Sequence, residues 1–371
     1  MVREDPKQKG LLFAGTEREV FFSIDEGENW QSLRKNMPAT SIRDLVIHED
    51  DLVIGTHGRS IWILDNINPL RNLANAFAAK NAYLFPPAQA TRVRYNMFSD
   101  TPLPPEEPAG QNPPDGATID YWLSANAGVV RIEITGLDGA AAMRVFSSKD
   151  QPEPIDTFSI PHPTYWIRPN QTISTQPGHH RIVWDLRHDP PKGADRQFAI
   201  AAVYHNTLSG PVGPYFLPGK YKIRLVVDGT IAQEQEIQIR LDPRVTFSND
   251  NLILQSVQSM MCYKSYNELL GLRNVIDLKL TNPKTKWAKG KKELLMALRG
   301  EGRPENPDVM YGSISDTPLE KETIVALQEK LLYLMSVLQS TEAKPTAAQV
   351  QAVTKLTGAV SELKKRAEII K

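Results

Sequence analysis

The stretch SIDEGENW, from Ser23 to Trp30, determines how the N-terminal part of this sequence is interpreted. It matches the pattern S-x-D-x-G-x-x-W at all four defined positions: Ser23, Asp25, Gly27 and Trp30. In such a turn the aspartate accepts backbone N–H bonds, the glycine takes a positive φ and the tryptophan ring packs over the hairpin. The motif therefore predicts a structural turn, and we do not expect Asp25 to be catalytic.

Short apolar runs separated by turn residues surround this motif and predict a β meander. Asp50-Asp51 is expected to form a tight turn between two of the strands. A second signature, GTHGRSIWILD from Gly55 to Asp65, places His57 and Arg59 in a turn. These two residues either line a pocket or close the loop, and loop closure is favoured. The predicted strands lie in LLFAGT, EVFFSI, DLVIH, DLVIGT and SIWILD.

Residues 69–117 are rich in proline and are expected to form a linker. Proline lacks a backbone donor, so this stretch should wrap over its neighbours without building a ladder of strands. Four aromatic residues favour a docked linker over a disordered one: Tyr83, Phe85, Tyr95 and Phe98.

Strand patterning returns in residues 118–245, which we expect to form a β-sandwich. Val130, Ile132 and Ile134 should point to the buried face, with Arg131, Glu133 and Thr135 opposite and a turn at Asp138-Gly139. The clearest hairpin runs from Tyr221 to Leu241 and turns at Asp228-Gly229, a sequence typical of a type I′ turn.

Residues 246–371 change to the helical period and predict a small bundle. One helix should occupy 249–280. Two more should follow capping boxes at Thr317–Glu320 and Thr346–Gln349 and pair antiparallel. The first helix is expected to bury Ile253, Val257, Met260, Leu269, Leu272, Ile276 and Leu280. The other two should bury Ile324, Leu327, Leu331, Leu334, Leu338, Val353, Leu356, Val360 and Leu363.

Composition excludes several classes of protein. Lys plus Arg and Asp plus Glu both number 43, so no net charge favours nucleic acid. A lysine-rich stretch around Trp287, from Lys284 to Lys292, is interpreted as a solvated loop. The single cysteine, Cys262, lies in a helical stripe and is expected in the core. The sequence has no predicted membrane span and no signal peptide.

No set of side chains in the sequence convincingly forms a catalytic or metal-binding site. A glycosidase needs two carboxylates at a fixed separation, and the formally available ones look like turn, strand-edge or linker residues: Asp25, Glu26, Glu28, Asp44, Asp65, Glu106 and Glu107. His179 and His180 are adjacent on a predicted strand and should point to opposite faces, which argues against a zinc site. We therefore expect no catalytic residue, cofactor or metal in this chain.

Three passages together resemble the C-terminal part of large BNR-repeat proteins: the SIDEGENW turn, known there as an Asp-box, GTHGRSIWILD and NPPDGATIDYWL. Such proteins are often labelled sortilin-like or glycosyl hydrolase. The passages VRIEITGLDG, GHHRIVWDLRHDPP and LPGKYKIRLVVDG resemble the immunoglobulin-like domain of flagellar hook-capping proteins. The resemblance implies that residues 1–68 are the last one to two blades of a β-propeller.

An isolated blade leaves open edges and an uncovered face, so the resemblance also implies upstream blades that are missing here. The expected function is a non-catalytic C-terminal module of an extracytoplasmic bacterial parent protein, binding protein or carbohydrate. The alternative is the tail of a sialidase-like glycoside hydrolase with its catalytic residues in the missing blades. A third hypothesis is a scaffold assembled through the helical tail.

Overall fold

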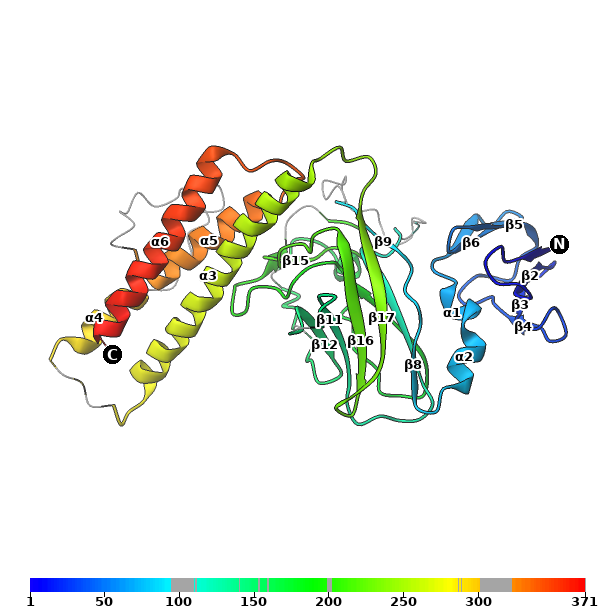
Figure 1. Ribbon diagram of the computed structural model, residues 1–371, viewed down its shortest axis with the longest axis horizontal. Coiled ribbons are helices and arrows are strands. Elements are labelled where there is room, and N and C mark those ends of the chain that lie inside the picture. Colours follow the sequence, from blue (N-terminus) through cyan, green and yellow to red (C-terminus); the bar gives the residue numbers. More distant parts are fainter. Residues whose placement is uncertain are drawn as a thin grey trace. The chain divides into compact units, whose positions relative to one another are not determined.

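The structure is a computed structural model that describes residues 1–94, 110, 112–139, 141–152, 154–158, 160–198, 202–285, 287, 289–300 and 322–370. The chain divides into two compact units. Unit 1 comprises Met1–Leu186, Ala201–Thr207 and Pro218–Asp242, and unit 2 comprises Arg187–Ile200, Leu208–Leu217 and Pro243–Lys371. Strands fill unit 1 and long helices dominate unit 2, so the expected order of β structure first and helices last is confirmed (Figure 1).

Unit 1 begins with two antiparallel sheets, each a simple meander. Cross-strand neighbours Phe13 and Phe22 on the first sheet and Leu45 and Ile54 on the second belong to one buried cluster. The first sheet contains β1 (Val2–Glu4), β2 (Leu12–Gly15), β3 (Val20–Ser23) and β4 (Gln31–Ser32). The second contains β5 (Ile42–His48), β6 (Asp51–Thr56) and β7 (Ile61–Leu64).

The turn between β5 and β6 differs slightly from the prediction. Asp51 already pairs with His48 in the ladder, so the turn consists of Glu49 and Asp50. Glu49 takes the positive φ of 53° that the tight reversal needs.

Two short helices follow the second sheet, α1 (Asn68–Arg71) and α2 (Leu73–Ala78). The guanidinium of Arg71 donates to Asp5, 2.8 Å from Nη2 to Oδ2, and also contacts Asp50. Asp5 and Arg71 are almost wholly buried, and the carboxylate of Asp5 also accepts from the backbone N–H groups of Lys7 and Gln8. This clamp joins the β1–β2 loop to the β5–β6 turn and so fixes the two sheets together.

The prediction that residues 69–117 build no ladder is wrong for its first part. β8 (Ala82–Leu84) pairs with β10, and β9 (Ala90–Arg92) pairs in parallel with β17. Pro86 and Pro87, two of the prolines of this stretch, lie between these strands and interrupt neither ladder. Phe85 is buried. Tyr95 and Phe98 lie outside the described residues.

The remainder of unit 1 contains two further sheets. One has the order β13-β10-β8 and the other β12-β11-β16-β17-β9, and the larger sheet curls as in part of a barrel (Figure 1). The side chains of Gln233 and Gln235 bond the backbone N–H and C=O of Leu84, which links the free edge of β8 to β17. The strands are β10 (Ala117–Leu123), β11 (Val130–Thr135), β12 (Arg144–Ser147), β13 (Gly178–Trp184), β16 (Gly219–Val227) and β17 (Thr230–Leu241), with a 3₁₀ turn at Thr164–Trp166.

The predicted hairpin is confirmed. β16 and β17 pair antiparallel, and both turn residues, Asp228 and Gly229, have positive φ angles of 49° and 83°. On β11 the expected alternation holds at Val130, Ile132 and Ile134, which are buried. Thr135 is the exception, because it is fully buried and donates through its hydroxyl to the carbonyl of Gly136.

Unit 2 is built on four helices, α3 (Asn249–Thr281), α4 (Lys291–Arg299), α5 (Ile324–Leu338) and α6 (Ala347–Ile370). The box at Thr346 is confirmed, because the Gln349 side chain accepts from the Thr346 N–H at 2.7 Å and the Thr346 hydroxyl accepts from the Gln349 N–H at 3.2 Å. The box at Thr317–Glu320 lies outside the described residues, and Thr323 caps α5. A short two-stranded sheet, β14 (Gln197–Phe198) and β15 (Ser209–Gly210), also belongs to this unit.

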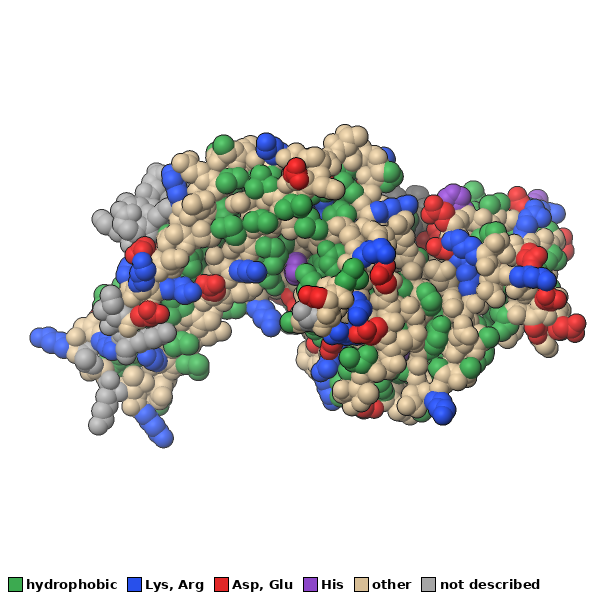
Figure 2. All heavy atoms as spheres, viewed as in Figure 1, with side chains coloured by type: hydrophobic (Ala, Val, Ile, Leu, Met, Phe, Trp, Pro, Cys, Tyr) green, Lys and Arg blue, Asp and Glu red, His purple; other side chains and the backbone are tan. Residues whose placement is uncertain are grey.

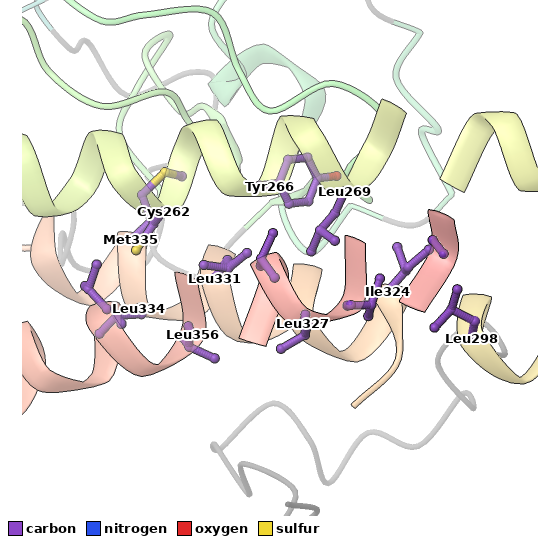
Figure 3. Packing of buried hydrophobic residues seen from close by; sticks show 14 of the residues in the cluster. Cys262, Tyr266, Leu269, Leu298, Ile324, Leu327, Leu331, Leu334, Met335 and Leu356 are labelled. Carbon is purple, nitrogen blue, oxygen red and sulfur yellow. The ribbon is translucent and has the colours of Figure 1, made fainter. Parts of the chain in front are cut away.

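The core of unit 2 lies between α3, α5 and α6. Figure 3 shows Cys262 and Leu269 of α3 near Leu331 of α5 and Leu356 of α6. Every apolar position predicted to be buried on α5 and α6 is buried. Cys262 is buried as expected, and burial raises the pKa of its thiol to about 12.

The predicted buried face of α3 is partly wrong. Leu269 and Ile276 are buried, but Ile253 and Val257 are exposed by 49% and 47%. Two polar residues take the place expected for apolar ones, because Gln255 donates to the Thr341 carbonyl and Ser259 accepts from Gln339. The buried face therefore includes side chains that bond the connection between α5 and α6, and the apolar residues Ile253 and Val257 lie outside it.

The basic stretch is also not a loop throughout. Lys291 and Lys292 open helix α4, which the sequence interpretation missed although Leu294, Leu295 and Leu298 show helical spacing. Among the described residues, no helix combines the length and the apolar character needed to cross a membrane.

Candidate functional site

The turn from Ser23 to Trp30 is a closed set of hydrogen bonds. The Asp25 carboxylate accepts from the Ser23 hydroxyl at 2.7 Å, from the backbone N–H of Asn29 at 2.9 Å and from its side-chain amide at 2.7 Å. The Ser23 hydroxyl oxygen in turn accepts from the backbone N–H of Gly27 at 2.9 Å. Gly27 has a φ of 95°, and the ring of Trp30 lies against it.

These bonds also set the ionisation of Asp25. Hydrogen bonds from Asn29 and Ser23 lower the pKa of its carboxyl to about 2. The group is therefore ionised over the neutral range and its oxygens already hold three donors. Such a carboxylate stabilises a turn and is a poor proton donor for acid catalysis.

His57 and Arg59 lie on the exposed loop between β6 and β7. Their backbone atoms close this loop: the N–H of His57 donates to the Ser41 carbonyl at 2.9 Å, and the Arg59 carbonyl accepts from the Trp62 indole at 2.8 Å. Both residues are exposed.

The other carboxylates considered for catalysis are dispersed. Glu26 and Glu28 are exposed on the turn, and Asp44 forms an exposed pair with Arg3 at 3.3 Å. Asp65 is half-buried, and burial together with the charge of Asp51 raises the pKa of its carboxyl. Glu106 and Glu107 lie outside the described residues.

A second ionic cluster of unit 1 centres on the buried Asp120, which sequence reasoning missed. Its carboxylate accepts from Arg181 at 2.8 Å, from His179 at 2.9 Å and from the Asn66 amide at 3.0 Å. Arg181 also donates to the backbone carbonyls of Asp65 and Asn66. The alternation of β10 places Asp120 on the face opposite the buried Ile119 and Tyr121, where a charged residue is ordinary, so the sequence pattern carries no signal of its burial.

This cluster joins the loop after β7 to strands β10 and β13. All three nitrogens of the Arg181 guanidinium and both oxygens of Asp120 form hydrogen bonds, an arrangement typical of a structural ion pair. The two adjacent histidines have different partners, since His179 bonds Asp120 and His180 contacts the Gln176 carbonyl at 2.7 Å. Within the described ranges, no group of three or more His, Cys, Asp or Glu side chains is placed to hold a metal ion.

The outer face of the β5–β6–β7 sheet is the most unusual surface of unit 1. Val46, Val53 and Ile63 lie side by side across the three strands, and Ile61 flanks them opposite Gly55. Ile61 and Ile63 are exposed by 71% and 56%. In the described part of the chain β7 pairs on one side alone, with β6. The apolar face therefore ends at an open sheet edge.

The outer face of the five-stranded sheet is of the opposite kind. Lys220 pairs with Glu236 at 2.6 Å and Lys222 with Glu234 at 3.1 Å, across neighbouring strands. This charged ladder is what a solvated sheet face normally carries. The contrast marks the β5–β6–β7 face as a surface suited to a partner.

Comparison with known proteins found no match to the chain among family models, curated proteins or solved structures.

Proposed function

We propose that this chain is a non-catalytic C-terminal module of a BNR-repeat propeller protein and docks onto further propeller blades. In this proposal β1–β4 and β5–β7 are the last one to two blades, residues 118–245 form an immunoglobulin-like β-sandwich, and residues 246–371 form a helical bundle. The single observation that carries the proposal is the exposed apolar face formed by Val46, Val53, Ile61 and Ile63.

The opposite end of the same pair of sheets supports docking as well. On the first sheet Val2, Ala14 and Phe21 form a cross-strand row facing away from the shared core, and Val2 is exposed. A sheet that faces water on one side is normally polar there. Both sheets instead carry a row of apolar side chains on the outer face as well, which suits sheets stacked between others at a spacing of about 10 Å.

The chemistry of the face favours protein over carbohydrate as the partner. Its side chains are aliphatic, and a sugar site needs polar groups that fix the hydroxyls. A further sheet with its own apolar face would bury these residues and could add a strand to the edge of β7.

A first test measures whether the face is a docking surface. The fluorescence of an apolar dye bound by the full chain should fall in the double variant Ile61→Lys and Ile63→Lys. The matched control Glu236→Lys, on the charged face of β17, should leave it unchanged. Equal dye binding by the double variant and the unchanged protein would count against docking at this face.

A second test separates the module from the rival enzyme. The purified chain should turn over no member of a panel of aryl glycosides. Turnover that a point change within residues 1–70 abolishes would overturn the proposal and support a glycoside hydrolase.

A further inference from the structure

The outward face of α3 carries a second stripe of side chains, opposite the face that packs in the core of unit 2; it is apolar towards both ends and has Lys264, Glu268 and Gly271 at its centre. From Val257 onward its members step by four and three residues, which is the spacing of a coiled-coil seam. Figure 2 shows groups of hydrophobic side chains on the visible surface of the helices. The stripe consists of Ile253, Val257, Met261, Lys264, Glu268, Gly271, Val275 and Leu278, all of them exposed.

We propose that α3 pairs through this stripe with α3 of a second copy of the chain, antiparallel about a two-fold axis at the level of Tyr266. The proposal concerns unit 2 and is independent of the sheets that carry the proposed function. Ile253 and Leu278 lie about 38 Å apart along the helix at 1.5 Å per residue.

Charge complementarity identifies the second copy as the occupant. The two-fold axis brings Lys264 of each copy opposite Glu268 of the other. Two Lys–Glu pairs therefore form at the centre of the stripe. In a parallel arrangement Lys264 would face Lys264. Glu268 also pairs with Lys364 of its own chain at 2.7 Å, and a carboxylate can accept from two cations.

Shape complementarity follows from the same axis. Met261 comes opposite Gly271, where an added Cβ would meet no atom within 4 Å, so a long side chain has space to enter. Val257 comes opposite Val275, and Ile253 lies within one residue of the position facing Leu278. Large side chains thus meet small ones or equal ones along the whole stripe.

Sedimentation of the full chain tests the dimer. The unchanged protein should sediment as a dimer and Val257→Glu as a monomer, because the substitution buries an unpaired charge. Tyr333→Glu, at an exposed aromatic residue of α5, is the matched control and should stay dimeric. A monomeric unchanged protein, or a dimeric Val257→Glu variant with native circular dichroism, would overturn the proposal.

Two further measurements test the register. Lys264→Glu should weaken the dimer by placing like charges opposite one another, and the double variant Lys264→Glu, Glu268→Lys should restore it. A Val257→Cys chain should form an intermolecular disulfide when mixed with a Val275→Cys chain and none by itself, since Cys262 is buried. Failure of the double swap to restore the dimer, or of the mixture to cross-link, would overturn the antiparallel register.

Discussion

Asp25 and Asp120 are both carboxylates held by several donors, but they differ in burial and therefore in what their removal does. Asp25 lies at the surface of a turn, whereas Asp120 is 2% exposed and faces Arg181. The pattern S-x-D-x-G-x-x-W was sufficient to predict the backbone bond from Asn29 to Asp25, but not the bonds from the side chains of Ser23 and Asn29. Nothing comparable marks Asp120, because its partners Asn66, His179 and Arg181 are distant in the sequence.

Replacing Asp25 with alanine should lower the thermal midpoint of unfolding at neutral pH. The folded pKa is depressed from 3.8 to about 2, so the ionised carboxylate contributes stability above the unfolded pKa that is lost as the pH falls through the folded pKa. The difference in thermal midpoint between Asp25→Ala and the unchanged protein should therefore shrink between those two pH values. Glu28→Ala, on the same turn, is the control; an equal effect of both would refute the role given to Asp25.

Replacing Asp120 with alanine should destabilise unit 1 by about 3 kcal/mol, because Arg181 then keeps a charge without its buried partner. Glu236→Ala, which removes an exposed ion pair, should cost at most about 1 kcal/mol. Urea unfolding of both variants checks the contrast. Equal losses of unfolding free energy in the two variants would mean that the Asp120–Arg181 ion pair contributes no more than an exposed one.

At the scale of elements, local signals predicted the hairpin at Asp228-Gly229 and the capping box at Thr346 because each depends on neighbouring residues. The face of α3 was mispredicted because periodicity counts apolar residues alone. Gln255 and Ser259 are buried through bonds to Thr341 and Gln339, which are formed only when α5 and α6 are in place. The strands β8 and β9 were missed for a similar reason, since their partners are β10 and β17.

The helical core can be tested on one helix. Leu331→Ala should lower the free energy of unfolding of unit 2 by about 3 kcal/mol, because the side chain is fully buried between helices. Tyr333→Ala, two residues further on and half exposed, should change it by less than about 1 kcal/mol. Denaturant titration followed by circular dichroism measures both, and a larger loss for Tyr333→Ala would contradict the assigned buried face.

At the scale of the whole molecule, both of our proposals concern assembly with other polypeptides. The sheets β1–β4 and β5–β7 carry apolar side chains on their outer faces, and α3 exposes Ile253 and Val257. Residue types alone suggested that Ile253 and Val257 were core, and gave no sign that Ile61 and Ile63 of β7 would be exposed. The structure places them outside the cores of their units. The outer face of β5–β7 and the outward face of α3 are therefore the two candidate interfaces.

The most direct measurement of the central claim is the maleimide labelling rate of an Ile63→Cys variant. The native thiol of Cys262 is buried and its pKa is raised to about 12, so it should contribute little to labelling. The rate is compared between residues 1–371 alone and the same residues joined to any polypeptide that is encoded in frame upstream of the Met1 codon. We expect a fast maleimide labelling rate at position 63 of residues 1–371 alone. The rate should fall several-fold when further propeller blades cover the outer face of β5–β7. An unchanged rate, or an in-frame stop codon directly upstream, would contradict this expectation.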